Sequence, residues 1–203
     1  MTELKGPLLL VGGGKMGGAL LRGWLAGGLA PGDAVVVEPN AAAMAEEAAR
    51  GVAVHPNADA IPDSFRPRVV VLAVKPQMMA AALPSYRRFV APGTLFLSIA
   101  AGKTIGWFER HLGDAAAIVR AMPNTPAAVG RGITVCCANA RAGAGDRALA
   151  DALLAAVGLV DWVEDEALID AVTAVSGGGP AYVFLLIECL AKAGEEAGLP
   201  ADL

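Results

Sequence analysis

The sequence predicts an α/β fold, a doubly wound, Rossmann-type and mostly parallel sheet followed by an all-helical segment. Two observations carry this prediction. Short, uninterrupted apolar runs alternate with segments of helical spacing, and a glycine-rich turn directly follows the first run. Such runs are typical of parallel strands that are buried on both faces. They occupy residues 8–11, 35–38, 52–55, 69–74, 94–100 and 116–122.

The intervals between these runs supply the helices and two further strands. Apolar residues recur at helical spacing over 16–25, and the segment 41–50 is rich in Ala and Glu. Residues 133–138 and 159–164 have the pattern of strands on either side of a helix at 143–157, and they can close the sheet. We therefore expect a dinucleotide-binding domain over residues 1–165.

A different pattern begins at Glu166. Residues 166–199 contain no strand pattern and are interrupted by Ser176-Gly177-Gly178-Gly179-Pro180. Helix stability falls by about 1 kcal/mol for each glycine and about 3 kcal/mol for an interior proline. We therefore expect two helices around a break, within a second domain over 166–203. Pro180 suits the first turn of the second helix, and exposed N–H groups there would favour a substrate carboxylate.

Composition excludes several classes of protein. The chain is 55% hydrophobic, yet Gly, Pro or charged residues interrupt every apolar run before the roughly 18 residues of a membrane span. The N-terminus lacks the layout of a signal peptide, so we expect a soluble, cytoplasmic protein without a membrane partner. A net charge of −4 with 16 unclustered Lys and Arg argues against nucleic acid.

The cysteines and histidines do not predict a metal site. The 3 cysteines and 2 histidines of the chain show no metal-ligand spacing. Cys136 and Cys137 are adjacent in an expected strand, so their side chains should point to opposite faces of the sheet, and Cys189 lies in an expected helix. We expect buried, reduced thiols and no metal.

The glycine-rich turn comprises Gly12-Gly13-Gly14-Lys15-Met16-Gly17 and matches the G-x-G-x-x-G pattern between a strand and a helix. Gly12 permits the tight turn, Gly14 lets the backbone approach a pyrophosphate, and Gly17 lets the helix lie close to the strand. The helix N-terminus, at Lys15 and Met16, offers N–H groups to the phosphates. The turn therefore predicts a bound dinucleotide.

Glu38 ends the second strand, where a carboxylate can accept hydrogen bonds from the adenosine ribose 2′-hydroxyl. An acid at this position disfavours the 2′-phosphate of NADP, and no arginine follows in Pro39-Asn40-Ala41. Glu38 thus leans toward NAD. S-adenosylmethionine and FAD proteins share the same pair of features, so those ligands stay open at this point.

Three other strand ends should meet at the same edge of the sheet. Lys75, before Pro76, can reach a phosphate or ribose, and the small residues around Ala100 leave room for a nicotinamide. Asn124 and Thr125, between two prolines, offer uncharged hydrogen bonds at the reaction centre. The apolar residues after Pro180 have the character of a packing or dimer surface.

Together these segments resemble pyrroline-5-carboxylate reductases, across nearly the whole chain and in the family's order. The matching pieces are VGGGKMGGALLRG, LAVKPQ, SIAAG, RAMPNTPA, EDEALIDAVTAVSGGGPAYVF and KAGEEAGLP. The resemblance implies hydride transfer from NADPH or NADH to the C=N carbon of 1-pyrroline-5-carboxylate, giving L-proline. A protonated imine is already electrophilic, so such an enzyme mainly orients its reactants.

The resemblance also implies roles for particular residues. Asn57 would contact the cofactor ribose or phosphate, and Glu166 and Thr173 would lie near the nicotinamide and substrate. Together with Ser176 of the glycine break, these two are the catalytic candidates. The remaining cofactor-binding candidates are Gly12, Gly14, Lys15, Met16, Gly17, Glu38, Ala73, Val74, Lys75, Pro76, Ile99, Ala100, Ala101, Pro123, Asn124 and Thr125.

The sequence departs from the family pattern in two places. The family commonly has Ser, Thr or Asn with a nearby Arg where Glu38 stands, an arrangement that fits NADP. It also continues beyond the point matched by Leu203, through helices that build a dimer and a Ser-Ser-Pro-Gly-Gly-like loop that holds the substrate carboxylate. We therefore expect a homodimer or higher homo-oligomer at full length, and an incomplete helical domain in this chain.

Two alternatives remain at this point. A β-hydroxyacid-type dehydrogenase would need a catalytic lysine early in the helical segment, whereas Lys192 is the only lysine after Lys103 and comes late. A catalytically inactive dinucleotide-binding protein is the other alternative.

Overall fold

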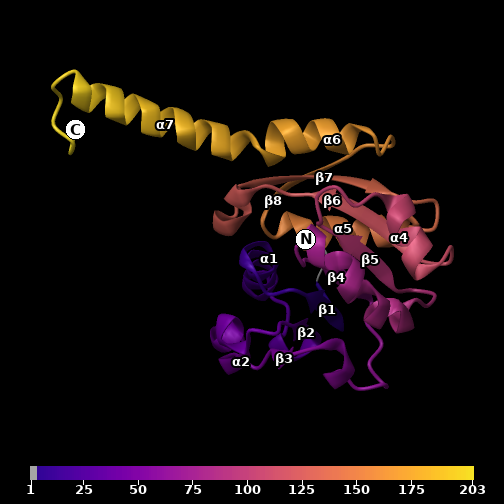
Figure 1. Cartoon of the computed structure of the whole chain (residues 1–203). Coiled ribbons are helices and arrows are strands. Elements are labelled where there is room, and N and C mark those ends of the chain that lie inside the picture. The colour runs from indigo at the N-terminus through magenta and orange to yellow at the C-terminus, as the bar shows by residue number, and fades with distance from the viewer. Residues whose placement is uncertain (1–3) are drawn as a thin grey trace.

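The computed structural model describes residues 4–203, so residues 1–3 of the expected first domain lie outside it. Its centre is an eight-stranded sheet (Figure 1). The strands are β1 Leu8–Val11, β2 Ala34–Val37, β3 Ala53–His55, β4 Val69–Leu72, β5 Leu95–Ser98, β6 Ala117–Met122, β7 Gly132–Ala138 and β8 Gly158–Trp162. Each expected apolar run overlaps one strand, although β2 begins and ends one residue earlier than the expected run 35–38.

The strand order is β3-β2-β1-β4-β5-β6-β7-β8. Every neighbouring pair is parallel except β6 and β7, which are antiparallel. The order reverses between β1 and β4, and in open α/β sheets the ligand lies at such a switch point, beyond the carboxyl ends of the strands. The prediction of a doubly wound, mostly parallel sheet is confirmed.

α-Helices and short 3₁₀ segments lie between the strands, and two further helices follow the last strand. The α-helices are α1 Lys15–Ala26, α2 Ala45–Ala49, α3 Met79–Ala82, α4 Ile105–Leu112, α5 Ala144–Ala155, α6 Leu168–Val172 and α7 Gly179–Glu196. The 3₁₀ turns are η1 Pro31–Asp33, η2 Ala41–Met44, η3 Ala58–Ala60, η4 Pro76–Met78, η5 Leu83–Phe89 and η6 Thr125–Val129. The helix expected over 41–50 is thus divided into η2 and α2. At the junction Met44 has φ −120° and is buried against Gly13, which accounts for the break.

Each face of the sheet has its own apolar core. Leu8 and Leu10 point to the core that α1 and α5 cover, whereas Leu9 and Val11 point to the core that α4 covers. Cys136 and Cys137 divide in the same way, as expected, with Cys136 in the first core. The expectation of a buried thiol is wrong for Cys189, which is exposed on α7.

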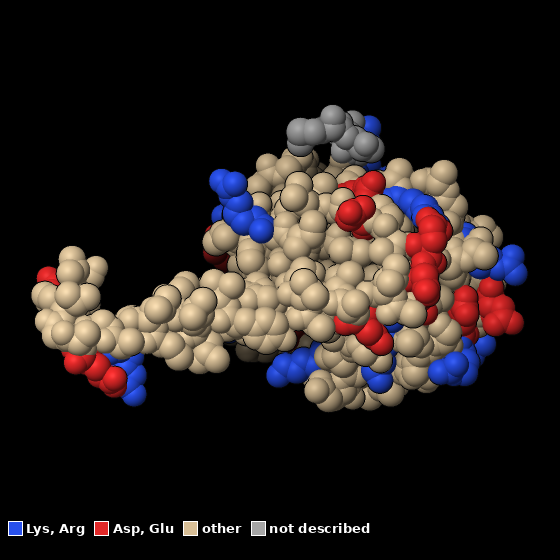
Figure 2. Space-filling view, turned by 90° about the horizontal axis from the view of Figure 1, so that it is seen from above, with Lys and Arg blue, Asp and Glu red and all other residues tan. Residues whose placement is uncertain are grey.

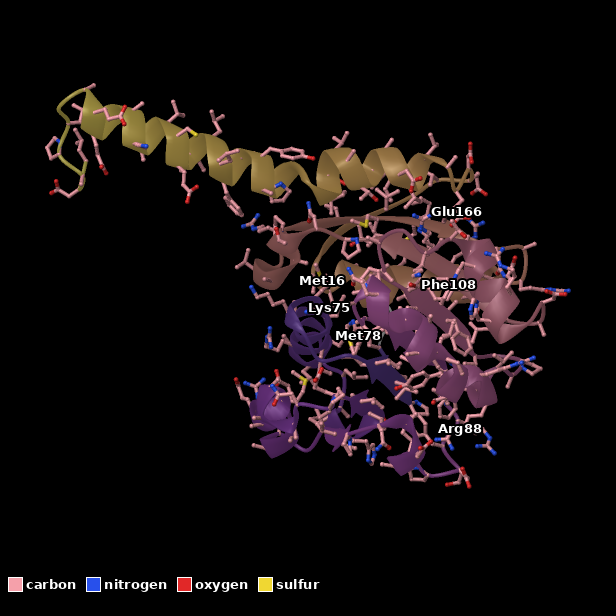
Figure 3. All side chains as sticks on the ribbon, viewed as in Figure 1. Met16, Lys75, Met78, Arg88, Phe108 and Glu166 are labelled. Carbon is pink, nitrogen blue, oxygen red and sulfur yellow. The ribbon has the colours of Figure 1, made fainter. Side chains whose placement is uncertain are left out.

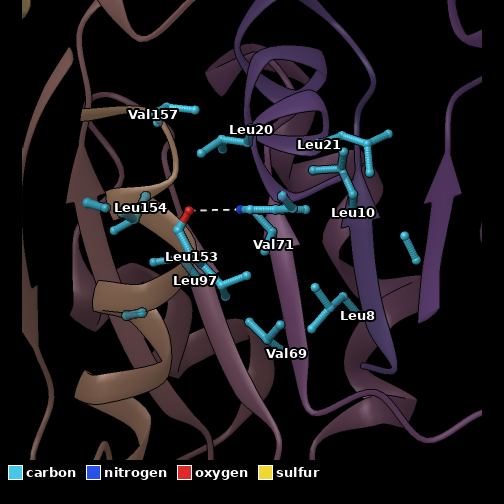
Figure 4. Packing of buried hydrophobic residues seen from close by; sticks show 14 of the residues in the cluster. Leu8, Leu10, Leu20, Leu21, Val69, Val71, Leu97, Leu153, Leu154 and Val157 are labelled. Atoms are coloured by element: carbon cyan, nitrogen blue, oxygen red, sulfur yellow. Dashed lines mark hydrogen bonds between the residues drawn. The ribbon is translucent and has the colours of Figure 1, made fainter. Parts of the chain in front are cut away.

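A side-chain hydrogen bond crosses the first core. Trp24, which is fully buried on α1, donates its indole N–H to the carbonyl oxygen of Leu153 on α5 at 2.8 Å (dashed line in Figure 4). Because a buried indole N–H without an acceptor is costly, this bond fixes α1 against α5 across the core.

The expected break at Ser176–Pro180 is wrong. One helical run spans Leu168–Glu196, because α6 continues through a π turn, η7 Thr173–Gly177, into α7. Gly178 keeps helical angles, φ −83° and ψ −21°, and its N–H bonds to the Thr173 carbonyl at 2.8 Å. The glycines are thus accommodated by a wider turn, and no new helix start presents N–H groups at Pro180.

The helix α7 projects beyond the sheet (Figure 1). None of its residues is buried, and Figure 2 shows the projecting part as largely uncharged, with charged side chains near its far end. By length and composition alone, Leu168–Glu196 passes as a membrane-spanning helix, contrary to our expectation that no run is long enough. A single such helix is weak support for a membrane location. The exposed large apolar residues within Leu168–Glu196 are Leu168, Val175, Tyr182, Val183, Phe184, Leu185, Leu186, Ile187 and Leu190.

Candidate functional site: a cavity at the sheet switch point

The glycine-rich turn joins β1 to α1 where the strand order reverses. Gly12 has φ +98°, and a Cβ there would lie 2.9 Å from the backbone carbon of Ala73 on the neighbouring strand end. A Cβ on Gly17 would overlap the carbonyl oxygen of Gly12, whereas nothing lies within 4 Å of the Cβ position of Gly14. Gly12 and Gly17 are therefore required by packing, and the space over Gly14 is open to a ligand.

The amino end of α1 faces this open space. Its first backbone bond runs from the Gly18 N–H to the Gly14 oxygen at 2.7 Å, so the preceding N–H groups of the first turn have no partner within the helix. Free N–H groups and the positive end of a helix dipole attract anions, which is the role that the sequence predicts for Lys15 and Met16. Lys15 is exposed and Met16 half-buried.

A cavity of about 550 Å³ lies beside the turn. This volume is within the usual range for small-molecule and cofactor sites. Figure 3 shows Lys75 and Met78 of its lining near the centre of the view. The lining brings together seven of the cofactor candidates: Gly12, Gly14, Glu38, Asn57, Ala73, Val74 and Lys75.

Glu38 has both carboxylate oxygens in use. Oε2 accepts the Gly13 N–H at 2.8 Å, and Oε1 accepts the Asn40 N–H at 2.9 Å. The half-buried side chain therefore joins the end of β2 to the glycine-rich turn while it lines the cavity. Each carboxylate oxygen can accept a second hydrogen bond, so the side chain can still accept from a ligand hydroxyl.

Asn57 caps a short turn at the same cavity. Its Oδ1 accepts the Ala60 N–H at 3.1 Å, which leaves its amide N–H groups for other partners. Pro76, at the first position of η4, does not line the cavity.

Sequence reasoning missed the far wall, which is made by Met78 and Tyr86 from the helical turns after β4. Tyr86 is 3% exposed, and desolvation by burial raises the pKa of its phenol to about 12. Because these turns are short and mostly 3₁₀, they carry no helical period that would have shown which side chains face inward.

The other cofactor candidates follow β5 and β6 and lie outside this cavity. Ile99 packs against the first core, Ala100 is buried, and Ala101 is exposed. In a doubly wound sheet this side of the switch point belongs to the second mononucleotide half, where a nicotinamide is expected.

Asn124 is already engaged within the protein. Its Oδ1 accepts the Ile133 N–H at 3.0 Å, and its Nδ2 donates to the Ser176 carbonyl at 3.2 Å. The side chain is 9% exposed, so it links the loop after β6 to β7 and to the π turn. Thr125 is exposed and Pro123 is buried.

The structure does not bring the three catalytic candidates together at one point. Thr173 and Ser176 share the π turn, and their hydroxyls donate to the carbonyls of Ile169 at 2.8 Å and Val172 at 3.1 Å. Glu166 precedes α6 and pairs with the buried Arg120 of β6 at 2.8 Å. Figure 3 shows Glu166 below α6, apart from Lys75.

Within residues 4–203, no group of three or more His, Cys, Asp or Glu side chains could hold a metal ion. Burial raises the pKa of the Cys136 thiol above its ordinary value, and that of Cys137 likewise, because desolvation disfavours both thiolates. Neither thiol therefore has the character of a nucleophile.

Two family models match the chain. Residues 8–102 match a model described as NADP oxidoreductase coenzyme F420-dependent, and residues 166–203 match one described as pyrroline-5-carboxylate reductase dimerisation.

Among curated proteins, the pyrroline-5-carboxylate reductase of Pseudomonas aeruginosa is 43% identical over 96% of this chain and 71% of its own length. Among solved structures, a pyrroline-5-carboxylate reductase from Coxiella burnetii has a TM-score of 0.89 at 34% identity, covering 98% of this chain and 74% of that one. The pyrroline carboxylate reductase of Plasmodium falciparum with NADP bound has a TM-score of 0.83 at 29% identity, covering 100% and 73%.

Proposed function

The chain belongs to the pyrroline-5-carboxylate reductase family, and from this premise we propose that it reduces the C=N bond of 1-pyrroline-5-carboxylate to give L-proline. The observation that carries the proposal is the 43% identity to a curated reductase over 96% of the chain. The dehydrogenase alternative lacks support because no lysine occurs between Glu166 and Lys192.

The residues at the switch point fit a nicotinamide dinucleotide. The open space over Gly14, the N–H groups at the start of α1 and the adjacent cavity suit a pyrophosphate and an adenosine. When bound, the dinucleotide supplies the hydride. The backbone of Gly14, Lys15, Met16 and Gly17 would hold its phosphates, and Gly12, whose N–H donates to the Val37 carbonyl, would shape the turn.

The rest of the cofactor would lie along the sheet edge. Asn57, Val74 and Lys75 would contact the adenosine half, and the residues after β5 and β6 would border the nicotinamide half. On that second side, Ala101 presents a small exposed side chain, Ala100 is buried in the core, and Asn124 holds the π turn near the end of β6. Thr173 and Ser176 are therefore our candidates for contact with the substrate.

The direct test measures NADH and NADPH oxidation in the presence of 1-pyrroline-5-carboxylate, with proline quantified by mass spectrometry. We expect one proline for each dinucleotide oxidised. Dinucleotide binding without proline would contradict the proposal and would support the inactive binding protein instead.

For the cofactor itself, we propose that NADH binds at least as tightly as NADPH. The Glu38 carboxylate lines the cavity at the end of β2, and Lys75, at the end of β4, is the one basic side chain in the described lining. A 2′-phosphate at the ribose would meet the negative charge of Glu38 at the end of β2, whereas Lys75 follows β4, on the other side of β1. The Plasmodium falciparum relative has NADP bound, so the cofactor preference of this chain has to be measured directly.

Glu38→Gln removes the charge and keeps one oxygen that can accept the Gly13 N–H, although its amide nitrogen cannot accept the Asn40 N–H. We expect this variant to shift the ratio of the NADPH and NADH dissociation constants toward NADPH by at least about tenfold. An unchanged ratio would contradict the assignment of Glu38 to cofactor choice.

We also propose that α7 packs against a second copy of the chain. Its side chains from Tyr182 to Ile187 are more than half exposed, an apolar surface that a monomer rarely leaves in water. Phe184→Glu should convert an oligomer to a monomer in light scattering, whereas Lys192→Ala should not. An oligomer that persists in Phe184→Glu would contradict this proposal.

We also propose that the enzyme is located in the cytoplasm, where thiols stay reduced, in keeping with its three free cysteines. Cell fractionation would test it. Recovery of the chain in the membrane pellet would favour insertion of Leu168–Glu196 instead.

A further inference from the structure

Arg120 is a charged residue in the middle of an otherwise apolar strand. It lies on β6, opposite Ser98 of β5 and Cys137 of β7, and only 3% of its surface is exposed. Its side chain points to the same face of the sheet as Ile118, the face covered by α4. A guanidinium is retained at such a place only with charged and hydrogen-bonding partners.

Both partners come from one helical turn after β8. Arg120 Nη1 donates to Glu166 Oε1 at 2.8 Å, and Nη2 donates to Asp170 Oδ1 at 3.2 Å. Ile169, between these two acids, is 1% exposed and belongs to the same core. Arg120 of β6 therefore fixes both the position of α6 along the helix axis and its rotation about that axis.

Glu166 also holds a third element. The same Oε1 atom accepts the backbone N–H of Ile105, the first residue of α4, at 2.7 Å. A helix leaves its first N–H groups without intrahelical partners, so the carboxylate satisfies one of them as well. Strand β6, helix α4 and helix α6 thus meet at one oxygen atom.

A second contact holds the other end of the π turn against the same strand. Met122, two residues after Arg120, lies so close to Gly177 that a Cβ there would be 2.7 Å from Met122 Cε. Asn124 reaches the Ser176 carbonyl from the loop that follows. Arg120 thereby holds the residues that precede the π turn, at Glu166 and Asp170. Met122 and Asn124 contact the π turn itself, at Gly177 and Ser176.

We propose that the buried Arg120, the partly buried Glu166 and the exposed Asp170 form a clamp that sets the position of the π turn Thr173–Gly177 over the carboxyl end of β6. Glu166 is then a positioning residue of the reduction and exchanges no proton with the substrate. This inference rests on the proposed function, because its kinetic consequence concerns the same reaction. Figure 3 shows Glu166 under α6, at the start of the helical run.

Glu166→Gln and Glu166→Ala distinguish the two roles. Glutamine keeps an oxygen for the Ile105 N–H and for Arg120 but cannot titrate, whereas alanine removes every contact. We expect kcat for pyrroline-5-carboxylate reduction to fall at least about 30-fold in Glu166→Ala. In Glu166→Gln we expect a fall of less than about fivefold and an unchanged shape of the pH profile.

The dissociation constant of NADH should stay within about threefold in both variants. Glu164→Gln is the matched control, because Glu164 is two residues away, 82% exposed and paired with Arg147 at the surface. It should leave all the measured values unchanged.

A folding defect is controlled by removing both charges. Arg120→Met combined with Glu166→Gln leaves no unpaired buried charge, and the introduced glutamine side chain can still accept the Ile105 N–H. We expect this double variant to fold, by circular dichroism, and to lose kcat as Glu166→Ala does.

Hydrogen exchange provides a readout independent of turnover. Amides of residues 173–178 should exchange faster in Glu166→Ala and in the double variant than in Glu166→Gln. If the unaltered chain reduces no pyrroline-5-carboxylate, the proposed function fails, whereas this exchange pattern would still support the clamp. A Glu166→Gln variant as inactive as Glu166→Ala, or lacking one limb of the pH profile, would overturn the positioning role.

Discussion

Replacing Gly17 by alanine would bring a methyl carbon into overlap with the carbonyl oxygen of Gly12 and to 3.2 Å from Ala73 Cβ. The obstacle is backbone, so β1 and α1 must move apart. Overpacking of this kind costs about 3 kcal/mol. For a chain of this size, that loss lowers Tm by about 6–12 °C.

Gly14→Ala is the informative partner, because nothing lies within 4 Å of its Cβ position and its backbone, φ −65° and ψ −170°, suits any residue. We expect the free energy of unfolding to change by less than about 0.5 kcal/mol. The methyl group would nevertheless occupy the space where the pyrophosphate approaches, so the dissociation constant should rise at least about tenfold, or 1.4 kcal/mol.

Thermal unfolding and calorimetric titration with NADH separate the two effects. Gly18→Ala serves as the control on the same helix, since its Cβ would meet the flexible end of Arg22 at 3.1 Å and would be in ordinary contact with the Gly13 carbonyl oxygen at 3.5 Å. Unchanged NADH affinity in a folded Gly14→Ala variant would refute the assignment of this turn to the pyrophosphate.

Three further predictions concern stability and reactivity. Trp24→Phe removes the indole bond to Leu153 and should lower the free energy of unfolding by about 1–3 kcal/mol in urea titrations, with NADH affinity unchanged. Burial raises the pKa of Tyr86 from 10.0 to about 12, so its contribution to stability is intact below pH 10 and is lost as the pH rises toward 12. Urea titrations between pH 10 and 12 should therefore show that the free energy of unfolding falls more steeply with pH in the unaltered chain than in Tyr86→Phe. An equal fall in both chains would contradict this prediction. Burial also raises the pKa of Cys136 and Cys137, so iodoacetamide at pH 8 should leave both unmodified in the folded chain, and rapid labelling seen by mass spectrometry would count against that burial.

The sheet could be predicted because buried parallel strands leave a continuous apolar signature. The run 8–11 coincides with β1. Gly12 was assigned to a tight turn, which its φ of +98° bears out, and Gly17 to close helix–strand packing, which the overlap of its Cβ position with the Gly12 oxygen bears out. Local sequence was sufficient there because the constraint is local.

The predictions that failed depended on longer-range contacts. Glycine and proline propensity predicted a break at 176–180, yet the helix runs on through a π turn that Met122 and Asn124 contact. Propensity measures isolated helices, and packing overrides it here.

Arg120 went unnoticed as a functional residue, although a single charge within the apolar run 116–122 is itself a signal. A buried cation requires acids from elsewhere in the chain, and the pair at Glu166 and Asp170 has the one-turn spacing to supply them.

The origin of the hydrogen added to the substrate tests the central claim most directly. With NADH that carries deuterium at both C4 positions of the nicotinamide and 1-pyrroline-5-carboxylate as substrate, we predict proline that carries one deuterium on the former imine carbon. Proline formed without that deuterium, or no proline from a folded chain that binds NADH, would contradict it.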